Sequence, residues 1–71
     1  MKEFNALVLS HYNFTNDKGK TYKGTKYLVS LGEFGSVEAN GPLDESLNVL
    51  DVVSVELTFK DNKFRVIKAN N

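Results

Sequence analysis

The sequence contains no cysteine and no tryptophan, and it has one proline and one histidine. Without cysteine the chain has neither disulfides nor thiolate zinc ligands, and one histidine cannot build a zinc site alone. No run approaches the roughly 18 apolar residues of a membrane span, and the first residues lack the basic-then-apolar pattern of a signal peptide. We therefore expect a cytoplasmic protein with no membrane partner and no cofactor or metal.

A chain of 71 residues is long enough for one domain, residues 1–71, with a small core. Such a core rarely supplies more than roughly 3–5 kcal/mol, so small domains without disulfides or metals commonly depend on a partner subunit. The run Ala6–Leu9 is apolar in both alternating phases, as at a barrel seam or a dimer contact. We expect a homodimer.

Nine basic and nine acidic side chains cancel, so the chain has no overall field that attracts a polyanion. The charges are unevenly distributed, however. Residues 1–31 carry five lysines and two acids, residues 32–59 carry six acids and no lysine or arginine, and residues 60–71 carry four basic residues and one acid. If the two ends meet in the fold they form one positive face, and the acidic middle forms a second candidate surface.

Short runs of β-branched and aromatic residues, separated by turn signals, predict strands and no long helix. Gly24 is expected at a bulge or bend, and Asp44 is expected to cap one helical turn that reaches Leu47 and Leu50. Three strands, a helical turn and a final hairpin predict an all-β, five-stranded OB-type barrel. The strands are expected at residues 3–15, 20–31, 36–39, 52–59 and 64–69.

Candidate catalytic groups are few. His11 is the only general-base candidate at neutral pH, and no serine and acid are spaced to act with it. We interpret it as a structural or surface histidine. Asp44 and Glu45 are interpreted as a helix cap, because a cation site needs more alternating oxygen ligands. The sequence therefore predicts no enzyme and no small-molecule substrate.

Aromatic rings and lysines interleave between residues 12 and 27. Binding to single-stranded nucleic acid without sequence preference needs cations that meet phosphates and exposed rings on which bases stack. Because strict alternation distributes these side chains over both faces, a projecting, twisted hairpin is needed to present them all. Tyrosines that are merely exposed, with lysines that protect strand edges, remain the alternative. The residues are Tyr12, Phe14, Tyr22, Tyr27, Lys18, Lys20, Lys23 and Lys26.

The last hairpin carries the same mixture, with Phe59 and Phe64 beside Lys63 and Arg65. These side chains extend the same groove if the hairpin lies beside the first strand, as barrel closure requires. Core packing is the alternative for the two phenylalanines. Either Val66 or Ile67, but not both, is expected in the core.

Four segments follow one another in the order "GKTY" (19–22), "YLVSLGEFG" (27–35), "VVSVELTF" (52–59) and "FRVIKA" (64–69). This order resembles the single-stranded DNA-binding proteins of filamentous phages. That resemblance implies a small OB-type barrel that dimerises and coats the replicating strand cooperatively, without a cofactor. It also implies a phosphate contact for Lys20 and a stacking ring for Tyr22, and more loosely a binding role for Phe59, Phe64 and Arg65.

The resemblance covers roughly residues 15–69 and rests on short motifs. This chain departs from the family by being shorter, by carrying lysine where the family favours arginine in the hairpin, and by its acidic third quarter. Those differences bear on how this chain would bind a single strand and on how its copies would assemble.

Taken together, the sequence predicts a homodimeric, sequence-nonspecific single-stranded DNA-binding protein for replication or recombination, in the host cytoplasm if it is viral. RNA remains a second possible ligand, because backbone and stacking contacts do not read the sugar. A protein-interaction module or inhibitor, which uses the acidic segment 33–56, is the alternative. The expected binding residues are Tyr12, Lys18, Lys20, Tyr22, Lys23, Lys26, Tyr27, Phe59, Lys63, Phe64 and Arg65.

Overall fold

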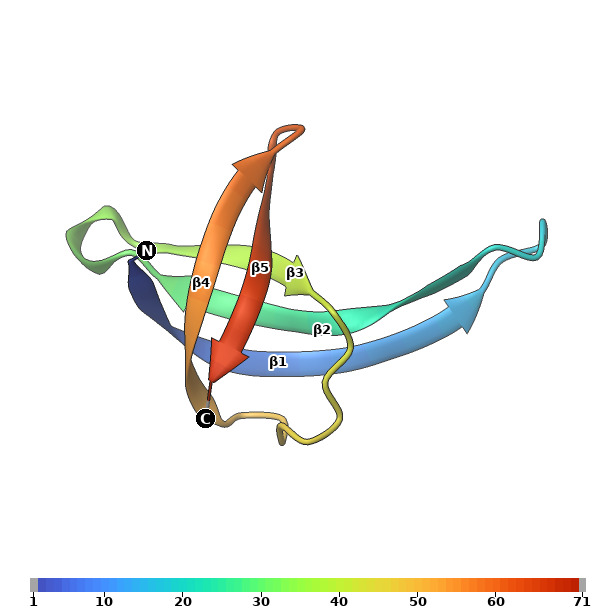
Figure 1. The fold of residues 1–71 in the computed structure, drawn as a ribbon, viewed down its shortest axis with the longest axis horizontal. Coiled ribbons are helices and arrows are strands. Elements are labelled where there is room, and N and C mark those ends of the chain that lie inside the picture. The colour runs from blue at the N-terminus through green and yellow to red at the C-terminus, as the bar shows by residue number, and fades with distance from the viewer. Residues whose placement is uncertain (1, 71) are drawn as a thin grey trace.

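The computed structural model describes residues 2–70, which form a closed barrel of five strands (Figure 1). Every expected strand is present, with its ends within two residues of the expected positions. No helix among residues 2–70 is long and apolar enough to cross a membrane. The strands are β1 (Glu3–Thr15), β2 (Thr21–Ser30), β3 (Ser36–Gly41), β4 (Val52–Lys60) and β5 (Lys63–Asn70).

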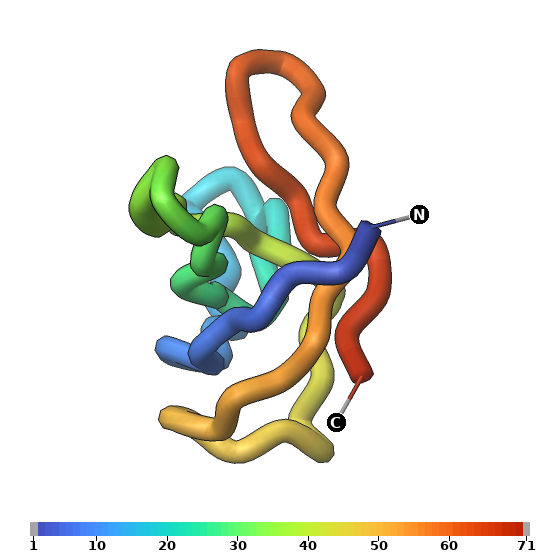
Figure 2. The backbone as a smooth tube through the Cα atoms, turned by 90° about the vertical axis from the view of Figure 1, so that its left-hand side faces the viewer, coloured from blue at the N-terminus to red at the C-terminus, as the bar shows by residue number. Residues whose placement is uncertain are grey.

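The strand order around the barrel is β1-β2-β3-β5-β4, and β1 closes the ring by pairing with both β2 and β4. Among the paired strands of residues 2–70, only β3 and β5 run parallel, with Asn40 opposite Arg65. This order is consistent with the OB-type barrel that the sequence predicted. Figure 2, which looks along the long axis, shows the chain curling around the core with the β4–β5 hairpin rising to one side.

The core is small and is built mainly from valine and alanine. Val66 is 3% exposed whereas Ile67 is 47% exposed, so Val66 is the residue that faces inward on β5. Leu47 reaches the core from the loop between β3 and β4. The buried apolar side chains are Ala6, Val8, Tyr27, Val29, Ala39, Leu47, Val53, Val55 and Val66.

A β-bulge in β1 reverses the direction of its side chains. Val8 lies opposite Tyr27 but Ser10 lies opposite Lys26, so Leu9 is an extra residue in the ladder. Val8 is buried before the bulge, and after it His11 faces the buried Thr25. Even-numbered residues of β1 after the bulge therefore point outward, whereas even-numbered residues before it, such as Val8, point into the core.

The sequence predicted a bulge or bend at Gly24, but the bulge lies in β1 and not at Gly24. Gly24 lies in regular register opposite Tyr12. A Cβ atom at this position would lie 2.5 Å from the Tyr12 hydroxyl oxygen and 2.7 Å from the Gly41 carbonyl oxygen. Glycine is needed here because the Tyr12 ring and the neighbouring strand approach the backbone closely.

The helical turn lies in a different connection from the expected one. A 3-10 turn, η1 (Gly32–Phe34), joins β2 to β3, whereas residues 42–51 between β3 and β4 form separate turns. Asp44 does accept a hydrogen bond from the Ser46 backbone N–H, at 3.1 Å. Leu50, however, has a φ of 77°, which no right-handed helix contains.

Two hairpins extend from the barrel. The first, which we call the arm, comprises residues 12–24, beyond the point where β3 stops pairing with β2 (Figure 1). Its tip is closed by the Asn16 side-chain oxygen, which accepts hydrogen bonds from the Lys18 and Lys20 N–H groups at 3.0 and 2.9 Å. Gly19 supplies the left-handed residue, with a φ of 81°.

The second hairpin joins β4 to β5 through a two-residue turn. Asp61 and Asn62 have φ values of 53° and 62°. Two consecutive left-handed residues match the twist of the strands that they connect, and asparagine and aspartate tolerate this conformation. The tight "KDNK" hairpin is thus confirmed.

Candidate nucleic-acid interface

A groove lies between the arm and the β4–β5 hairpin. It consists of two hollows, of about 410 and 250 Å³, that share Tyr12, Asn40 and Arg65. Because the three shared side chains belong to β1, β3 and β5, the groove crosses the outer surface of the barrel. Its lining consists of Tyr12, Tyr22, Lys23, Asn40, Gly41, Pro42, Lys63, Phe64, Arg65, Val66 and Ile67.

The arm contributes a row of aromatic rings. The Phe14 and Tyr22 rings are stacked, with centroids 5.3 Å apart and planes at 24°, and the Tyr12 centroid lies 6.4 Å from that of Phe14. The Lys20 Nζ lies 5.3 Å from the centroid of the Tyr22 ring. Phe14 and Tyr22 are 55% and 39% exposed. The rings and the lysine thus form one partly exposed cluster on the arm.

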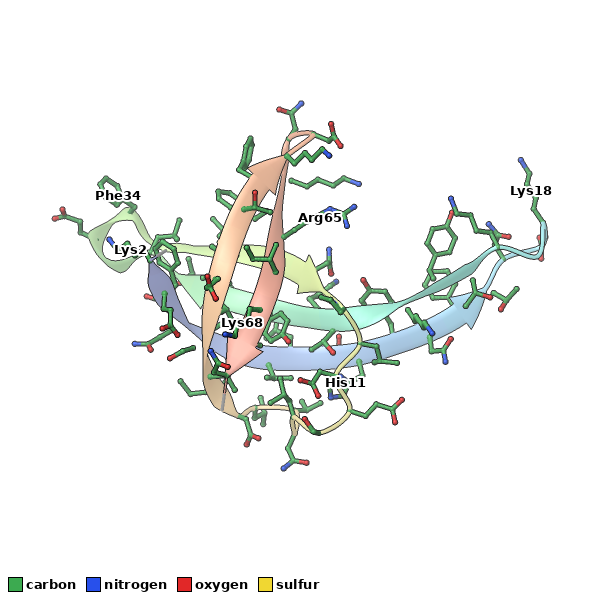
Figure 3. The ribbon with its side chains drawn as sticks, in the orientation of Figure 1. Lys2, His11, Lys18, Phe34, Arg65 and Lys68 are labelled. Atoms are coloured by element: carbon green, nitrogen blue, oxygen red, sulfur yellow. The ribbon has the colours of Figure 1, made fainter. Side chains whose placement is uncertain are left out.

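The β4–β5 hairpin contributes a ring and two cations. Lys63 and Arg65 are exposed, and Phe64 lies between them, half-buried against the core. Phe59 packs edge-on against Phe64, with centroids 4.8 Å apart. In Figure 3 the Arg65 side chain extends to the side of β5 on which the arm lies.

The groove is electropositive, although the whole chain carries no net charge. No carboxylate is among its lining residues, and Lys23, Lys63 and Arg65 are. Within residues 2–70 the one ion pair joins Lys26 to Glu38, at 3.9 Å, so the three groove cations have no acidic partner in that part of the chain. Such a cluster attracts phosphate.

Six of the eleven expected binding residues line the groove, and a seventh, Lys20, lies over the Tyr22 ring. Lys18 lies at the tip of the arm (Figure 3), and Lys26 pairs with Glu38. Phe59 is 58% exposed and does not line the groove. The six are Tyr12, Tyr22, Lys23, Lys63, Phe64 and Arg65.

The prediction that Tyr27 stacks on a base is wrong. Its side chain is 1% exposed and lies in the core, opposite Val8 on β1 and Ala39 on β3. Burial raises the pKa of the Tyr27 hydroxyl, and the negative charge of Asp44 raises it further. Tyr27 has the opposite parity from Tyr22 along β2, so only one of the two rings can face outward.

Sequence reasoning missed Asn40, which lines both hollows. Its amide can donate and accept hydrogen bonds, so it is able to contact a base edge or a sugar. The residue precedes Gly41 and Pro42, and this "NGP" segment gave only a turn signal. The parallel pairing of Asn40 with Arg65, which places it in the groove, is a long-range contact without a local signature.

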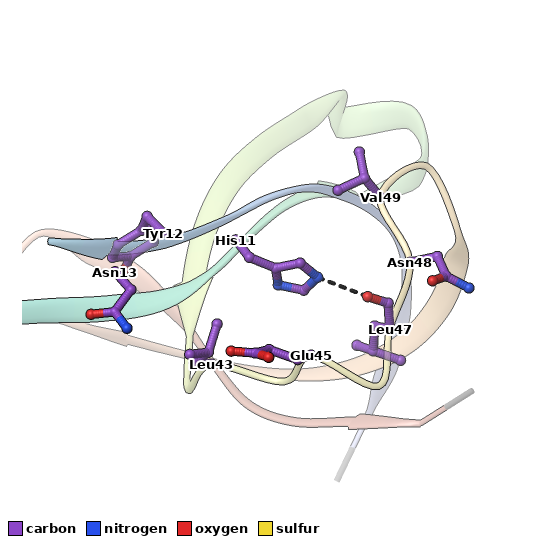
Figure 4. Close-up of a pocket in the computed structure, with 8 residues that line it drawn as sticks. All are labelled: His11, Tyr12, Asn13, Leu43, Glu45, Leu47, Asn48 and Val49. Carbon is purple, nitrogen blue, oxygen red and sulfur yellow. Dashed lines mark hydrogen bonds between the residues drawn. The ribbon is translucent and has the colours of Figure 1, made fainter.

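His11 connects the loop 42–51 to the barrel through two hydrogen bonds. Its Nε2 lies 2.7 Å from the Leu47 carbonyl oxygen (Figure 4) and its Nδ1 lies 2.8 Å from the Thr25 Oγ1. A carbonyl only accepts, so Nε2 is the donor to Leu47, and in this tautomer of the neutral ring Nδ1 accepts from the Thr25 hydroxyl. The Thr25 Oγ1 in turn accepts from the Asp44 backbone N–H, at 3.0 Å. Both ring nitrogens therefore serve structural contacts, in agreement with the interpretation of His11 as a structural residue.

Comparison of the chain with protein-family models, curated proteins and solved structures finds no match. Within residues 2–70 no three histidine, cysteine, aspartate or glutamate side chains come together in a way that would hold a metal ion. The interpretation of the groove therefore rests on its own geometry and charge.

We predict that Thr25→Val destabilises the fold by roughly 1–3 kcal/mol. The substitution keeps the shape of the buried Thr25 side chain but leaves the partly buried His11 Nδ1 and Asp44 N–H without their partner. Thr21→Val is the matched control, because the Thr21 hydroxyl bonds Thr15 on the exposed arm; we expect a change within about 0.5 kcal/mol. Chemical denaturation followed by circular dichroism measures both, and equal effects would contradict the structural role of this network.

Proposed function

We propose that this protein binds single-stranded DNA without sequence preference, and that it coats and protects the strand during replication or recombination. The observation that carries the proposal is the convergence of two hairpins, distant in sequence, on one groove that combines aromatic rings with unpaired cations. A surface that combines these two groups is complementary to a strand whose bases are unpaired.

The groove contains groups that can bind both repeating parts of a single strand, the phosphates and the bases. Lys23, Lys63 and Arg65 are available to phosphates, and each contact releases condensed counterions. Tyr22 is exposed and Tyr12 is half-buried, and both line the groove, where their rings can contact bases. Stacking is tolerant of sequence because every base has a π-face. Duplex DNA fits less well, since its bases already stack on one another.

DNA and RNA both contain the phosphates and bases that the groove would contact. Cations meet phosphates in both, and rings meet bases in both, so neither contact reads the 2′-hydroxyl. We therefore expect oligo-dT and oligo-rU of equal length to bind with affinities of the same order. A DNA preference of tenfold or more would indicate a further contact with the sugar, for which Asn40 is the side chain in position.

The protein-interaction alternative assigns the working surface to the acidic segment 33–56. Three of its acids already have partners within the chain: Glu38 pairs with Lys26, Asp44 accepts from Ser46, and Asp51 accepts from the Asn48 N–H. Of these contacts only the pair between Glu38 and Lys26 offsets a negative charge, whereas the cations of the groove have no acidic partner within residues 2–70. The groove therefore supports nucleic-acid binding more strongly.

We predict that Tyr22→Ala weakens binding to oligo-dT by roughly 1–3 kcal/mol and leaves the melting temperature nearly unchanged. The ring lies on the exposed arm, so its removal takes away a stacking platform but opens no core cavity. Tyr22→Phe should bind almost normally, because stacking uses the ring and not the hydroxyl. Fluorescence anisotropy with a labelled oligonucleotide measures the affinity. A folded Tyr22→Ala protein that binds as tightly as the parent would refute this role.

We also predict that Arg65→Gln reduces the salt dependence of binding. Each phosphate contact on a single strand contributes about −0.7 to the slope of log affinity against log salt, so the slope should become shallower by about that amount. Lys68→Gln is the matched control, since Lys68 lies on the same strand but outside the groove. Equal changes in slope for both variants would show that the effect of Arg65 is only one of net charge.

A further inference from the structure

A third hollow opens off one end of the groove. Its volume is about 190 Å³, which makes it the smallest of the three. Residues 63–65, 65–67 and 66–69 of β5 line the three hollows in turn, so the hollows follow this strand in one direction. A single strand that lies in the groove is therefore able to reach the third hollow. The residues that the third hollow shares with the groove are Pro42, Val66 and Ile67.

The third hollow differs from the groove in its charge. The carboxylate of Asp44 lines it, whereas no carboxylate lines the groove. Lys68 also lines it, but Lys68 lies directly opposite Glu56 on β4, and opposite charges in such positions offset each other. The hollow therefore has no surplus of positive charge with which to hold phosphate. An uncharged base, and not the backbone, is the part of a strand that suits it.

The Tyr27 hydroxyl reaches the third hollow, although the Tyr27 ring packs in the core. The side chain is 1% exposed and lines the hollow. Burial raises the pKa of the hydroxyl, and the charge of Asp44 in the same hollow raises it further, so the hydroxyl end of the ring is the end that lies there. Within residues 2–70 the hydroxyl makes no hydrogen bond, and no fully enclosed side-chain oxygen lacks a partner. The hydroxyl is therefore open to the hollow and free to bind a ligand.

Asp44 has one carboxylate oxygen in use and one free. Its Oδ1 accepts from the backbone N–H and the hydroxyl of Ser46, and these two hydrogen bonds hold the carboxylate in place. Its Oδ2 has no hydrogen-bond or ion-pair partner within residues 2–70. The lining of the hollow thus offers one free acceptor, from Asp44, and one free donor, from Tyr27, among mostly apolar side chains.

We propose that the third hollow binds the base of one nucleotide and prefers cytosine. The N4 amino group of cytosine donates to the Asp44 carboxylate, a pairing that suits this base, and a neighbouring ring acceptor receives the Tyr27 hydroxyl proton. Thymine carries a carbonyl oxygen in place of the amino group, and that oxygen cannot bond a carboxylate. The purines have two rings and fit the smallest of the three hollows less well.

This inference rests on the proposed function and adds one preferred position to it. The phosphate and stacking contacts of the groove hold a strand of any sequence. The third hollow then ranks such strands by whether a cytosine is in place to enter it.

Fluorescence anisotropy tests the proposal with a short labelled oligo-dT and with the same strand in which one central thymine is replaced by cytosine or by adenine. The cytosine strand should bind at least about fivefold more tightly than oligo-dT, the lower end of what contacts to one base discriminate. The adenine strand should bind like oligo-dT. Because the three strands carry the same number of phosphates, their charge does not contribute to the difference.

Three variants locate the preference. In Asp44→Asn the Oδ1 still accepts from Ser46, but an amide nitrogen replaces the free oxygen, so the preference should turn from cytosine to thymine, whose O4 accepts. Tyr27→Phe should lower the cytosine preference and stay folded, because the hydroxyl makes no hydrogen bond within residues 2–70. Glu45→Gln is the matched control: it removes the neighbouring carboxylate, which lines a different hollow, and should keep the preference of the parent. Circular dichroism verifies the fold of each variant.

Equal binding of the cytosine and thymine strands by the parent protein would overturn this inference and leave the proposed function intact. The same holds for an adenine strand that binds as tightly as the cytosine strand. A folded Asp44→Asn or Tyr27→Phe protein that keeps the full preference of the parent, or a Glu45→Gln protein that loses it, would also overturn the inference alone. A parent protein that binds none of the three strands would refute the proposed function, and this inference with it.

Discussion

One extra residue in β1, Leu9, determines which side chains of this small protein face inward and which face solvent. Before the bulge the even-numbered side chains of β1 fill the core, as Val8 does; after it, His11 faces inward. The following tyrosine therefore lies on the outer surface, where it covers Gly24 and lines the groove. With strict alternation Tyr12 would point inward, and the groove would lose one of the side chains that join its two hollows.

The barrel itself brings the two halves of the groove together. The arm and the β4–β5 hairpin are far apart in sequence, and the parallel contact between β3 and β5 places Asn40 and Arg65 side by side between them. The His11 and Thr25 network holds the loop after β3 against β1 and β2. The core that supports this arrangement consists largely of small side chains, so polar contacts such as this network contribute a large share of the stability.

The strands and both hairpins could be predicted from the sequence because they depend on local signals. Alternating side chains and turn residues such as Gly19, Asp61 and Asn62 act over a few positions. The sequence also led us to expect that the last hairpin extends the surface of the arm if it lies beside the first strand, and in the structure residues of both hairpins line the groove.

The features that could not be predicted depend on long-range contacts. No local signal places the extra residue at Leu9, and Gly24 suggested a bulge although it serves a close approach by Tyr12. Tyr27 looked equivalent to Tyr22 in composition, but the inward phase of β2 buries it. The helical turn was placed after Asp44 because a capping residue does not reveal that Leu50 will adopt a positive φ.

The central claim is that single strands bind in the groove between the arm and the β4–β5 hairpin. Titration of isotope-labelled protein with a short oligo-dT, followed by amide chemical shifts, tests it most directly. The account predicts that the largest shifts cluster at Tyr22, Asn40 and Arg65, and that the amides of Leu28 and Val52 change little. Shifts that centre on the acidic segment 33–56, or no shifts at all at low salt, would contradict it.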